Sequence, residues 1–440
     1  MKHDQGYLRL LRDCPGYRLL FSARAISLLG DWFSLIATVA LLREVVGSDS
    51  RVLGGMLILR LLPYFLAGPL AGVVADRFHR KRIMITTDIV RCALALGLVA
   101  APATPFPIAY VYVLVALQVV GGAFFEPARA AALPQLVPDR LLPAANALGA
   151  IVWSVMFTLG AALGGVVSDL LGWRTALVID AATYVVSALL LARIALPRRE
   201  RKAGRAVDWL TWTGVRDFRD GMRYLASRPA VATAIAVKSG WGIAGAVTLF
   251  LTLFGERVYA LGGRPDLGVA LLLTARALGT AIGPMLARRM VTDDSPEAMR
   301  KLLGAAFLWP LVWYLVFSWV RDPWLAAACV VLAHFGGSVL WVYSTVLLQR
   351  SVPDELLGRI MATDLGLTTL TMSLSTWVYG MLAAAPDADL RALVRWMTLS
   401  LVVPAAAWWF AAGRWRPGAR EGDGRYNLGT DGSGQGDGRG

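Results

Sequence analysis

The chain has 440 residues, of which 57% are hydrophobic and only 17% are charged. Two runs, residues 92–125 and 141–168, contain no charged side chain, and a membrane-spanning helix needs only about 20 consecutive apolar residues. Repeated runs of this kind exclude disordered, collagen-like and ordinary soluble globular proteins, because none of those classes needs apolar spans of such length.

The net charge of +14 follows the pattern of a membrane protein rather than that of a nucleic-acid-binding protein. Of the 44 basic residues, 31 lie in alternate connections between apolar segments, 7 in the opposite connections and 6 within or at the ends of spans. Because basic residues gather on the cytoplasmic side of membrane proteins, both termini are predicted to be cytoplasmic. The three cysteines lie far apart and have no spacing typical of a metal site or a disulfide framework.

Apolar windows of about 20 residues predict twelve membrane-spanning helices. An even number agrees with two termini on the same side of the membrane. The first window is too long for the core of a cleavable signal peptide, so it is expected to remain as a span. The predicted spans are residues 19–42, 52–75, 83–101, 108–125, 146–168, 175–196, 231–253, 267–287, 302–320, 324–347, 360–383 and 393–412.

Two repeats at one offset indicate that the second half of the chain is a copy of the first. The Gly-Pro pair at residues 68–69 recurs at 283–284, and residues 137–142 recur in similar form at 352–357, both 215 positions later. A duplication of six plus six spans is typical of transporters whose substrate path lies between the halves. The predicted segments are a cytoplasmic N-terminus (1–18), two six-helix bundles (19–196 and 231–412), a cytoplasmic linker with an amphipathic helix (197–230) and a disordered cytoplasmic tail (413–440).

The connection between the second and third spans carries a charged motif. It contains Gly72, Asp76, Arg77, Arg80 and Lys81, with His79 at the position of a second glycine. This order resembles the signature G-x-x-x-D-R-x-G-R-R/K of the Major Facilitator Superfamily, and the resemblance extends over residues 8–412. Residues 29–33, 125–129 and 145–148 further resemble the branch with macrolide-type and enterobactin-type exporters. The resemblance implies an all-α membrane fold with twelve transmembrane helices in two pseudo-symmetric six-helix bundles.

The resemblance also implies a gate on the cytoplasmic side. In the superfamily, the carboxylate at the position of Asp76 contacts the N-terminus of the eleventh helix, here near Gly358, where it biases the rocking of the two halves. Arg77 or Arg80 is expected to pair with Glu126 at the end of the fourth span. The alternative is that these basic residues only fix the topology.

Ionisable side chains inside membrane spans are costly, which makes them candidates for function. Asp31 is the main candidate for proton coupling, because Arg24 lies two helical turns before it and Arg60 lies in the next span. Burial and a nearby arginine act in opposite directions on the protonation of a carboxylate, so a motion that separates the pair can load or release a proton. A static ion pair between the first two spans is the alternative.

Three other carboxylates lie within spans. Asp88 is expected to pair with Arg91, which follows three residues later on the same helical face. Asp88, Asp180 and Asp364 are further candidates for proton coupling, although the Ser and Thr residues around Asp364 are equally expected for helix packing.

Gly160, Gly164 and Gly165 in the fifth span resemble an antiporter signature, with alanine at its proline position. Small residues also let helices approach closely whatever the function of the protein. Export by antiport and simple helix packing therefore both remain open.

In the superfamily, the first, fourth, seventh and tenth spans line the central cavity. The resemblance therefore predicts a largely apolar and aromatic cavity that suits a bulky amphiphilic ligand. Lys238 favours an anionic group on that ligand, whereas Trp241 favours a cation. His334 is expected either to form a structural hydrogen bond or to relay protons. The cavity candidates are Arg24, Gln118, Lys238, Trp241, His334, Trp341 and Tyr343.

The sequence contains no phosphate-binding G-x-x-x-x-G-K-S/T segment and no clustered catalytic motif, so neither an ATP-driven pump nor an enzyme is expected. We expect a secondary transporter in the bacterial cytoplasmic membrane that exports a hydrophobic or amphiphilic small molecule, such as a drug or a siderophore, by proton-coupled alternating access. Its expected partners are the substrate, protons and the lipid bilayer, without nucleic acid, metal or cofactor. Uptake of a nutrient or flipping of a lysolipid is the alternative.

Overall fold

The computed structural model describes residues 10–138, 141–196, 219, 222–223, 225–290, 296–352 and 354–414. Among these residues the structure is helical, and the only β-type pairing is an isolated bridge between Leu261 and Arg264. Most of the predicted linker helix and almost the whole predicted tail lie outside the described residues.

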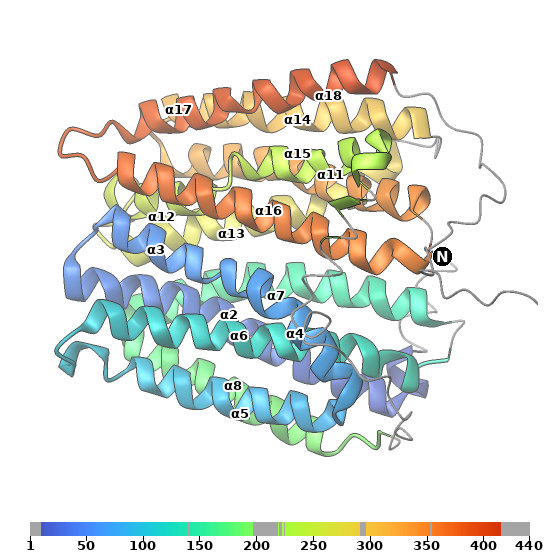
Figure 1. Cartoon of the computed structure of the whole chain (residues 1–440). Helices are drawn as coiled ribbons and strands as arrows, with labels where there is room; N and C mark the ends of the chain where they lie inside the picture. The colour runs from blue at the N-terminus through green and yellow to red at the C-terminus, as the bar shows by residue number, and fades with distance from the viewer. Residues whose placement is uncertain are drawn as a thin grey trace, which may run out of the picture.

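The first part of the chain forms helices that run back and forth along one direction (Figure 1). They are α2 (Pro15–Val46), α3 (Ser50–Leu59), α4 (Leu62–Arg77), α5 (Arg80–Leu98), α6 (Pro107–Ala132), α7 (Leu142–Leu171) and α8 (Trp173–Ala192). The second part repeats this arrangement. Its helices are α11 (Pro229–Gly242), α12 (Val247–Arg257), α13 (Pro265–Met290), α14 (Pro296–Trp319), α15 (Pro323–Ser351), α16 (Asp354–Leu382), α17 (Leu390–Ser400) and α18 (Val402–Arg414).

The breaks between helices have local causes in the sequence. Gly172 separates α7 from α8 at φ 82°, a backbone conformation that glycine adopts without a steric penalty. The interruption between α3 and α4 falls at Arg60 and Leu61, just before Pro63, whose ring clashes with the preceding turn. A comparable interruption separates α17 from α18 just before Pro404. The break at Arg60 matters most, because it lies beside the candidate site.

Helices of each half pack mainly on one another. In the first half, α2 packs on α7 and α8, and α5 packs on α6 and α8. In the second half, α13 and α14 pack on α15, and α11 packs on α15 and α16. The halves meet where α7 packs on α13 and α3 packs on α16. Figure 1 shows the first-half helices, in blue to green, below the second-half helices, in yellow to red.

Nine stretches of helix among the described residues are long and apolar enough to cross a membrane. The stretch Ile151–Ala192 covers two successive helices, whereas α5 and α16 are not among the nine. Large apolar side chains such as Leu66, Phe106 and Leu189 are exposed, as expected for a surface that lipid covers. The all-α membrane fold is confirmed, and the count of twelve spans and the exact segment boundaries stay predictions.

Candidate functional site

A cavity of about 350 Å³ lies between the two halves of the protein. In the first half, its lining comes from α2, from the α3–α4 break and from parts of α4 to α8. In the second half, Gly245, Thr248, Arg276, Met372 and Thr376 line it. The cavity therefore borders both units that an alternating-access transporter must move relative to each other.

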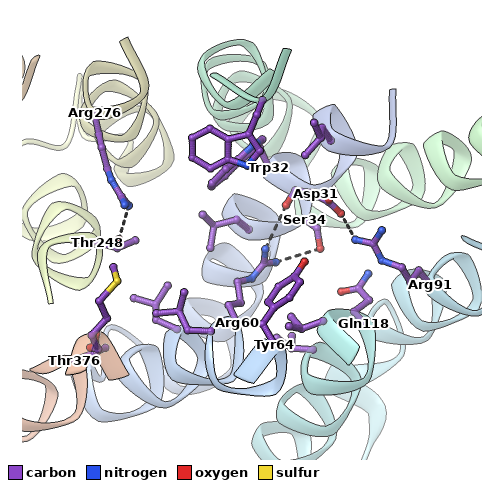
Figure 2. Close-up of a pocket in the computed structure, with 18 of the residues that line it drawn as sticks. Asp31, Trp32, Ser34, Arg60, Tyr64, Arg91, Gln118, Thr248, Arg276 and Thr376 are labelled. Carbon is purple, nitrogen blue, oxygen red and sulfur yellow. Dashed lines mark hydrogen bonds and ion pairs between the residues drawn. The ribbon is translucent and has the colours of Figure 1, made fainter. Parts of the chain in front are cut away.

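Asp31 lines the cavity from the middle of α2 and lies at the centre of a polar network (Figure 2). Arg91 of α5 donates a hydrogen bond to one carboxylate oxygen, and the Tyr184 hydroxyl donates to the same oxygen at 2.6 Å. Arg24 lies 3.8 Å from the other oxygen. The Asp31 side chain is 23% exposed, so it is paired and still accessible from the cavity.

The predicted pairing of Asp88 with Arg91 is wrong. The buried carboxylate of Asp88 accepts a hydrogen bond from Ser187 of α8 at 2.6 Å, while Arg91 turns to Asp31 and stacks 4.4 Å from the Tyr184 ring. The helical three-residue spacing identifies neighbours on one helix only, and here stronger partners lie on α2 and α8.

The expected pairing of Glu126 with Arg80 is not what the structure has, and the Arg77 side chain, the other expected partner, lies outside the described residues. Glu126 forms ion pairs with Arg24 and, at 2.9 Å, with Arg129 on its own helix. Arg80 donates to the Ala131 carbonyl at 2.5 Å. Glu126 and Asp31 thereby contact different terminal nitrogens of the same Arg24 guanidinium group.

Other residues of the predicted gate are only partly described. Lys81 donates to the carbonyls of Ala192 and Ile194 at 2.6 and 2.9 Å, so it ties the start of α5 to the end of α8. The structure describes only the backbone at four other residues, Gly72, Asp76, Arg77 and Gly358. The latch of Asp76 against the eleventh predicted span stays a prediction.

Two more arginines reach the cavity, one from each half. Arg60, at the α3–α4 break, donates to the Asp31 carbonyl at 3.3 Å and to the Ser34 hydroxyl at 3.4 Å. Arg276 of α13 donates to the Thr248 hydroxyl and lies 5.6 Å from the Phe157 ring. The sequence places Arg276 within a span, a signal that could have identified it as a cavity residue.

Aromatic rings form much of the remaining wall. Trp32 stacks on Phe157 with ring centroids 3.7 Å apart, and Trp153 meets both rings edge-on. Tyr64 and Tyr184 line the cavity beside them. Four of these five residues border the cavity directly, which agrees with the predicted aromatic character, although none of the five was predicted from the sequence to line the cavity.

Gln118 is the one further predicted residue that lines this cavity. It contacts the fully buried Asp180 at 3.5 Å, behind the cavity wall. Lys238, Trp241, His334, Trp341 and Tyr343 do not line it.

The predicted residues of the second half instead pair within that half. Lys238 forms a buried ion pair with Asp364 and lies 5.2 Å from the Trp341 ring. The His334 ring bonds the Tyr314 hydroxyl at 2.7 Å. Neither Lys238 nor Trp241 therefore reports on the charge of a cavity ligand.

A second set of ion pairs joins the halves at the C-terminal end of α2. Arg43 binds Asp266 at 2.6 Å and Glu256 at 3.4 Å, both from the second half. Asp169 and Arg264 pair across the halves at 3.0 Å. These charges at the ends of spans were not singled out from the sequence.

The glycines of α7 lie where helices approach closely. A Cβ at Gly160 or Gly164 would meet α2 at Trp32 or Phe33, at 2.6 and 3.1 Å. A Cβ at Gly165 would lie 2.1 Å from the Ala270 Cβ of α13, so this glycine sits at the contact between the halves.

Among the described residues, no group of three His, Cys, Asp or Glu side chains is placed to hold a metal ion. What the cavity offers a ligand is a set of charged and aromatic side chains.

Comparisons with known proteins agree with a transport function. A chain from Bacillus subtilis strain 168, the uncharacterized MFS-type transporter YfiS, is 24% identical over 88% of this chain and 91% of its own length. Macrolide efflux protein A of Streptococcus pyogenes is 24% identical over 87% of this chain and 91% of its own length.

A solved bacterial homologue of the human lysosomal transporter Spinster, in an inward-facing and occupied conformation, shares the fold with a TM-score of 0.69. It is 15% identical, and the match covers 92% of this chain and 99% of that one. The family model of the Major Facilitator Superfamily matches residues 20–376. With the helical membrane fold and the cavity between its halves, the protein is a transporter rather than an enzyme, and the chain belongs to the Major Facilitator Superfamily.

Proposed function

We propose that this protein is a proton-coupled exporter of a hydrophobic or amphiphilic small molecule, and that it works by alternating access in the bacterial cytoplasmic membrane. In this proposal both termini are cytoplasmic, and the two bundles at residues 19–196 and 231–412 rock about the cavity. The observation that carries the proposal is Asp31, a carboxylate that borders this cavity while three helices hold it.

Proton coupling is supported by the partners of Asp31. Its ionised carboxylate holds Arg91 from α5 and Arg24 from α2, and it accepts a hydrogen bond from Tyr184 of α8. A proton on Asp31 removes the charge that these arginines neutralise, so the contacts among α2, α5 and α8 must change. A protonation step can in this way bias one packing of the helices over another.

Export is supported by the wall of the cavity and by one relative. Trp32, Trp153 and Tyr64 offer large apolar surfaces, which suit a bulky ligand more than a sugar. The relative from Streptococcus pyogenes is described as an efflux protein for macrolides, and its match extends over most of both chains. From this relative we infer that this protein also exports its substrate, but we do not infer that the substrate is a macrolide.

The test is accumulation in everted membrane vesicles, in which export from the cell becomes uptake into the vesicle. A cationic dye, a macrolide and a catecholate siderophore would be compared with and without a protonophore, in wild type and in Asp31→Asn. Asp88→Asn is the matched control, because Asp88 is buried against Ser187 and does not line the cavity.

We expect one compound to accumulate only with an intact gradient, in wild type and in Asp88→Asn but not in Asp31→Asn. Gradient-driven accumulation that persists unchanged in Asp31→Asn would show that Asp31 has a structural role. Accumulation in intact cells instead of everted vesicles would replace export with uptake of a nutrient or a lysolipid.

A further inference from the structure

The cavity contains more positive than negative side chains. The described residues that line it include four arginines, Arg24, Arg60, Arg91 and Arg276, but Asp31 is the only carboxylate among them. An excess of charge in a poorly hydrated site is unfavourable unless an opposite charge balances it. The question is therefore which of these arginines already have a partner.

Two of the four arginines are neutralised by the protein itself. Arg91 binds Asp31, and Arg24 lies between Asp31 and Glu126. These two cations thus face two carboxylates, and together they form a balanced cluster on one side of the cavity.

Arg60 and Arg276 have no such partner among the described residues. Arg60 contacts a carbonyl and a hydroxyl, and Arg276 contacts the Thr248 hydroxyl and an aromatic ring. The Nε atom of each is buried and has no hydrogen-bond partner. A guanidinium group offers five N–H donors in a planar fork that matches an anionic group, and the hydrogen bonds above use two donors of Arg60 and one of Arg276.

The two arginines come from opposite halves of the transporter. Arg60 lies at the break between α3 and α4, and Arg276 lies within α13. They are 216 positions apart, one residue from the 215-residue offset that relates the two halves. Figure 2 shows them entering the site from different helices, with Arg276 beside Thr248 and Arg60 beside Ser34.

We propose that the ligand carries an anionic group, a carboxylate, sulfonate or phosphate, which binds between Arg60 and Arg276 while an apolar part lies against Trp32 and Trp153. The proposal rests on the transport function proposed above only in that it treats the ligand as the substrate. It excludes cationic drugs as preferred ligands, because a cation would add to an uncompensated positive charge. An anion that both halves bind also joins the two units that must move relative to each other.

The charge preference can be measured by binding to the purified full-length chain in an uncharged detergent. Three probes share a naphthalene ring: naphthalene-2-sulfonate, neutral 2-naphthylmethanol and a permanently cationic 2-naphthylmethyl-trimethylammonium. Displacement of radiolabelled sulfonate gives the affinity for each. We expect the sulfonate to bind at least about tenfold more tightly than the cation, which corresponds to one charge-assisted contact.

The variants Arg60→Gln and Arg276→Gln identify the groups responsible. Each should weaken sulfonate binding about tenfold while it changes 2-naphthylmethanol binding less than about twofold. Arg51→Gln is the control, because Arg51 is 59% exposed, pairs with Asp49 and does not line the cavity. Equal weakening of the sulfonate and of the neutral probe would mean that the arginines only support the fold of the cavity, and it would overturn the proposal.

The ranking of the three probes by affinity is measured on the wild-type protein, so it does not depend on whether a variant folds. If the cation binds as tightly as the sulfonate or more tightly, the ligand is not an anion and the proposal fails, while transport in vesicles can still succeed. Competition by lysophosphatidylglycerol, but not by lysophosphatidylcholine, at lower concentration than the sulfonate would assign the anionic group to a lipid headgroup. The reverse order would assign it to a free small molecule.

Discussion

Arg43 is predicted to hold the two halves together at the face that we assign to the outside. Its guanidinium group, on α2, binds Asp266 at 2.6 Å and Glu256 at 3.4 Å across the interface. The Arg43 side chain is 25% exposed, whereas Glu256 and Asp266 are 1% and 10% exposed. The substitution Arg43→Gln removes the cation and leaves two nearly buried carboxylates facing each other.

The size of the effect follows from what is lost. A hydrogen bond to a charged group contributes about 1.5–3 kcal/mol, and the partial exposure of Arg43 places each of its bonds near or below the lower limit. Counting both bonds, we expect Arg43→Gln to destabilise the outer-closed form by about 2 kcal/mol. The ratio of closed to open forms then falls roughly thirtyfold, so that an equilibrium of about 100 to 1 becomes about 3 to 1.

Cysteine labelling can measure this shift. Cys14, Cys92 and Cys329 would be replaced, and Thr376→Cys would place one thiol in the cavity wall. A membrane-impermeant maleimide added from the proposed outer side reaches that thiol only while the halves are apart. Labelling should therefore proceed about 25-fold faster with Arg43→Gln, because the open fraction rises from about 1% to about 25%.

A control and a rescue make the result specific to this contact. Arg51→Gln removes an exposed arginine that pairs with Asp49 within the first half, so it should leave the labelling rate unchanged. That hydrogen bond from Arg51 lowers the pKa of Asp49, but it does not join the halves. Adding Glu256→Gln and Asp266→Asn to Arg43→Gln removes the unpaired carboxylates and should slow labelling again. An unchanged rate with Arg43→Gln alone would refute the reasoning.

Three further predictions concern other contacts. Asp31→Asn removes the one carboxylate in the described cavity wall, so it should tighten naphthalene-2-sulfonate binding about fivefold, as measured by displacement; weaker binding would contradict it. Lys238→Met leaves a buried carboxylate unpaired and should lower the free energy of unfolding by about 3 kcal/mol, whereas adding Asp364→Leu should recover most of it, as thermal unfolding would show. Gly165→Ala places a Cβ 2.1 Å from the Cβ of Ala270, so it should speed the cavity labelling described for Arg43, and Ala270→Gly should reverse this.

The sequence was informative wherever one helix or one residue type decides the outcome. Long apolar runs predicted the membrane helices, and costly charges within spans pointed to Asp31 with Arg24 and Arg60, which do lie together. These predictions succeed because the penalty for apolar surface in water, or for charge in lipid, depends little on the details of the fold.

Partners on other helices could not be predicted in the same way. Arg91 was assigned to Asp88 because both lie on one helical face, yet Arg91 binds Asp31 on another helix. Lys238 was placed in the cavity by analogy, yet Asp364 neutralises it inside the second half. Which side chains meet depends on how helices rotate about their axes, and the pattern of apolar residues leaves that rotation poorly determined in a chain that is apolar on most faces.

An anionic ligand would also decide which part of the proton-motive force drives export. A proton on Asp31 frees Arg91 and Arg24, makes the cavity more positive and so favours the anion; by linkage, the anion favours the proton. A proton and a ligand that favour each other's binding do not displace each other, and a proton that left with the anion would cancel its charge. Export driven by the membrane potential therefore requires the anion to leave while Asp31 is ionised.

The membrane potential can expel it, because an inside-negative potential of 100 mV favours the exit of one negative charge by about 2.3 kcal/mol, roughly a fiftyfold gradient. In everted vesicles with potassium, valinomycin should therefore abolish sulfonate accumulation, while nigericin, which removes only the pH gradient, should leave most of it. Asp31→Asn should still transport poorly, because it holds the anion too tightly to release it. The opposite pattern, loss with nigericin and survival with valinomycin, would mean that proton and ligand exchange at Asp31 and that the ligand is not the anion inferred from Arg60 and Arg276.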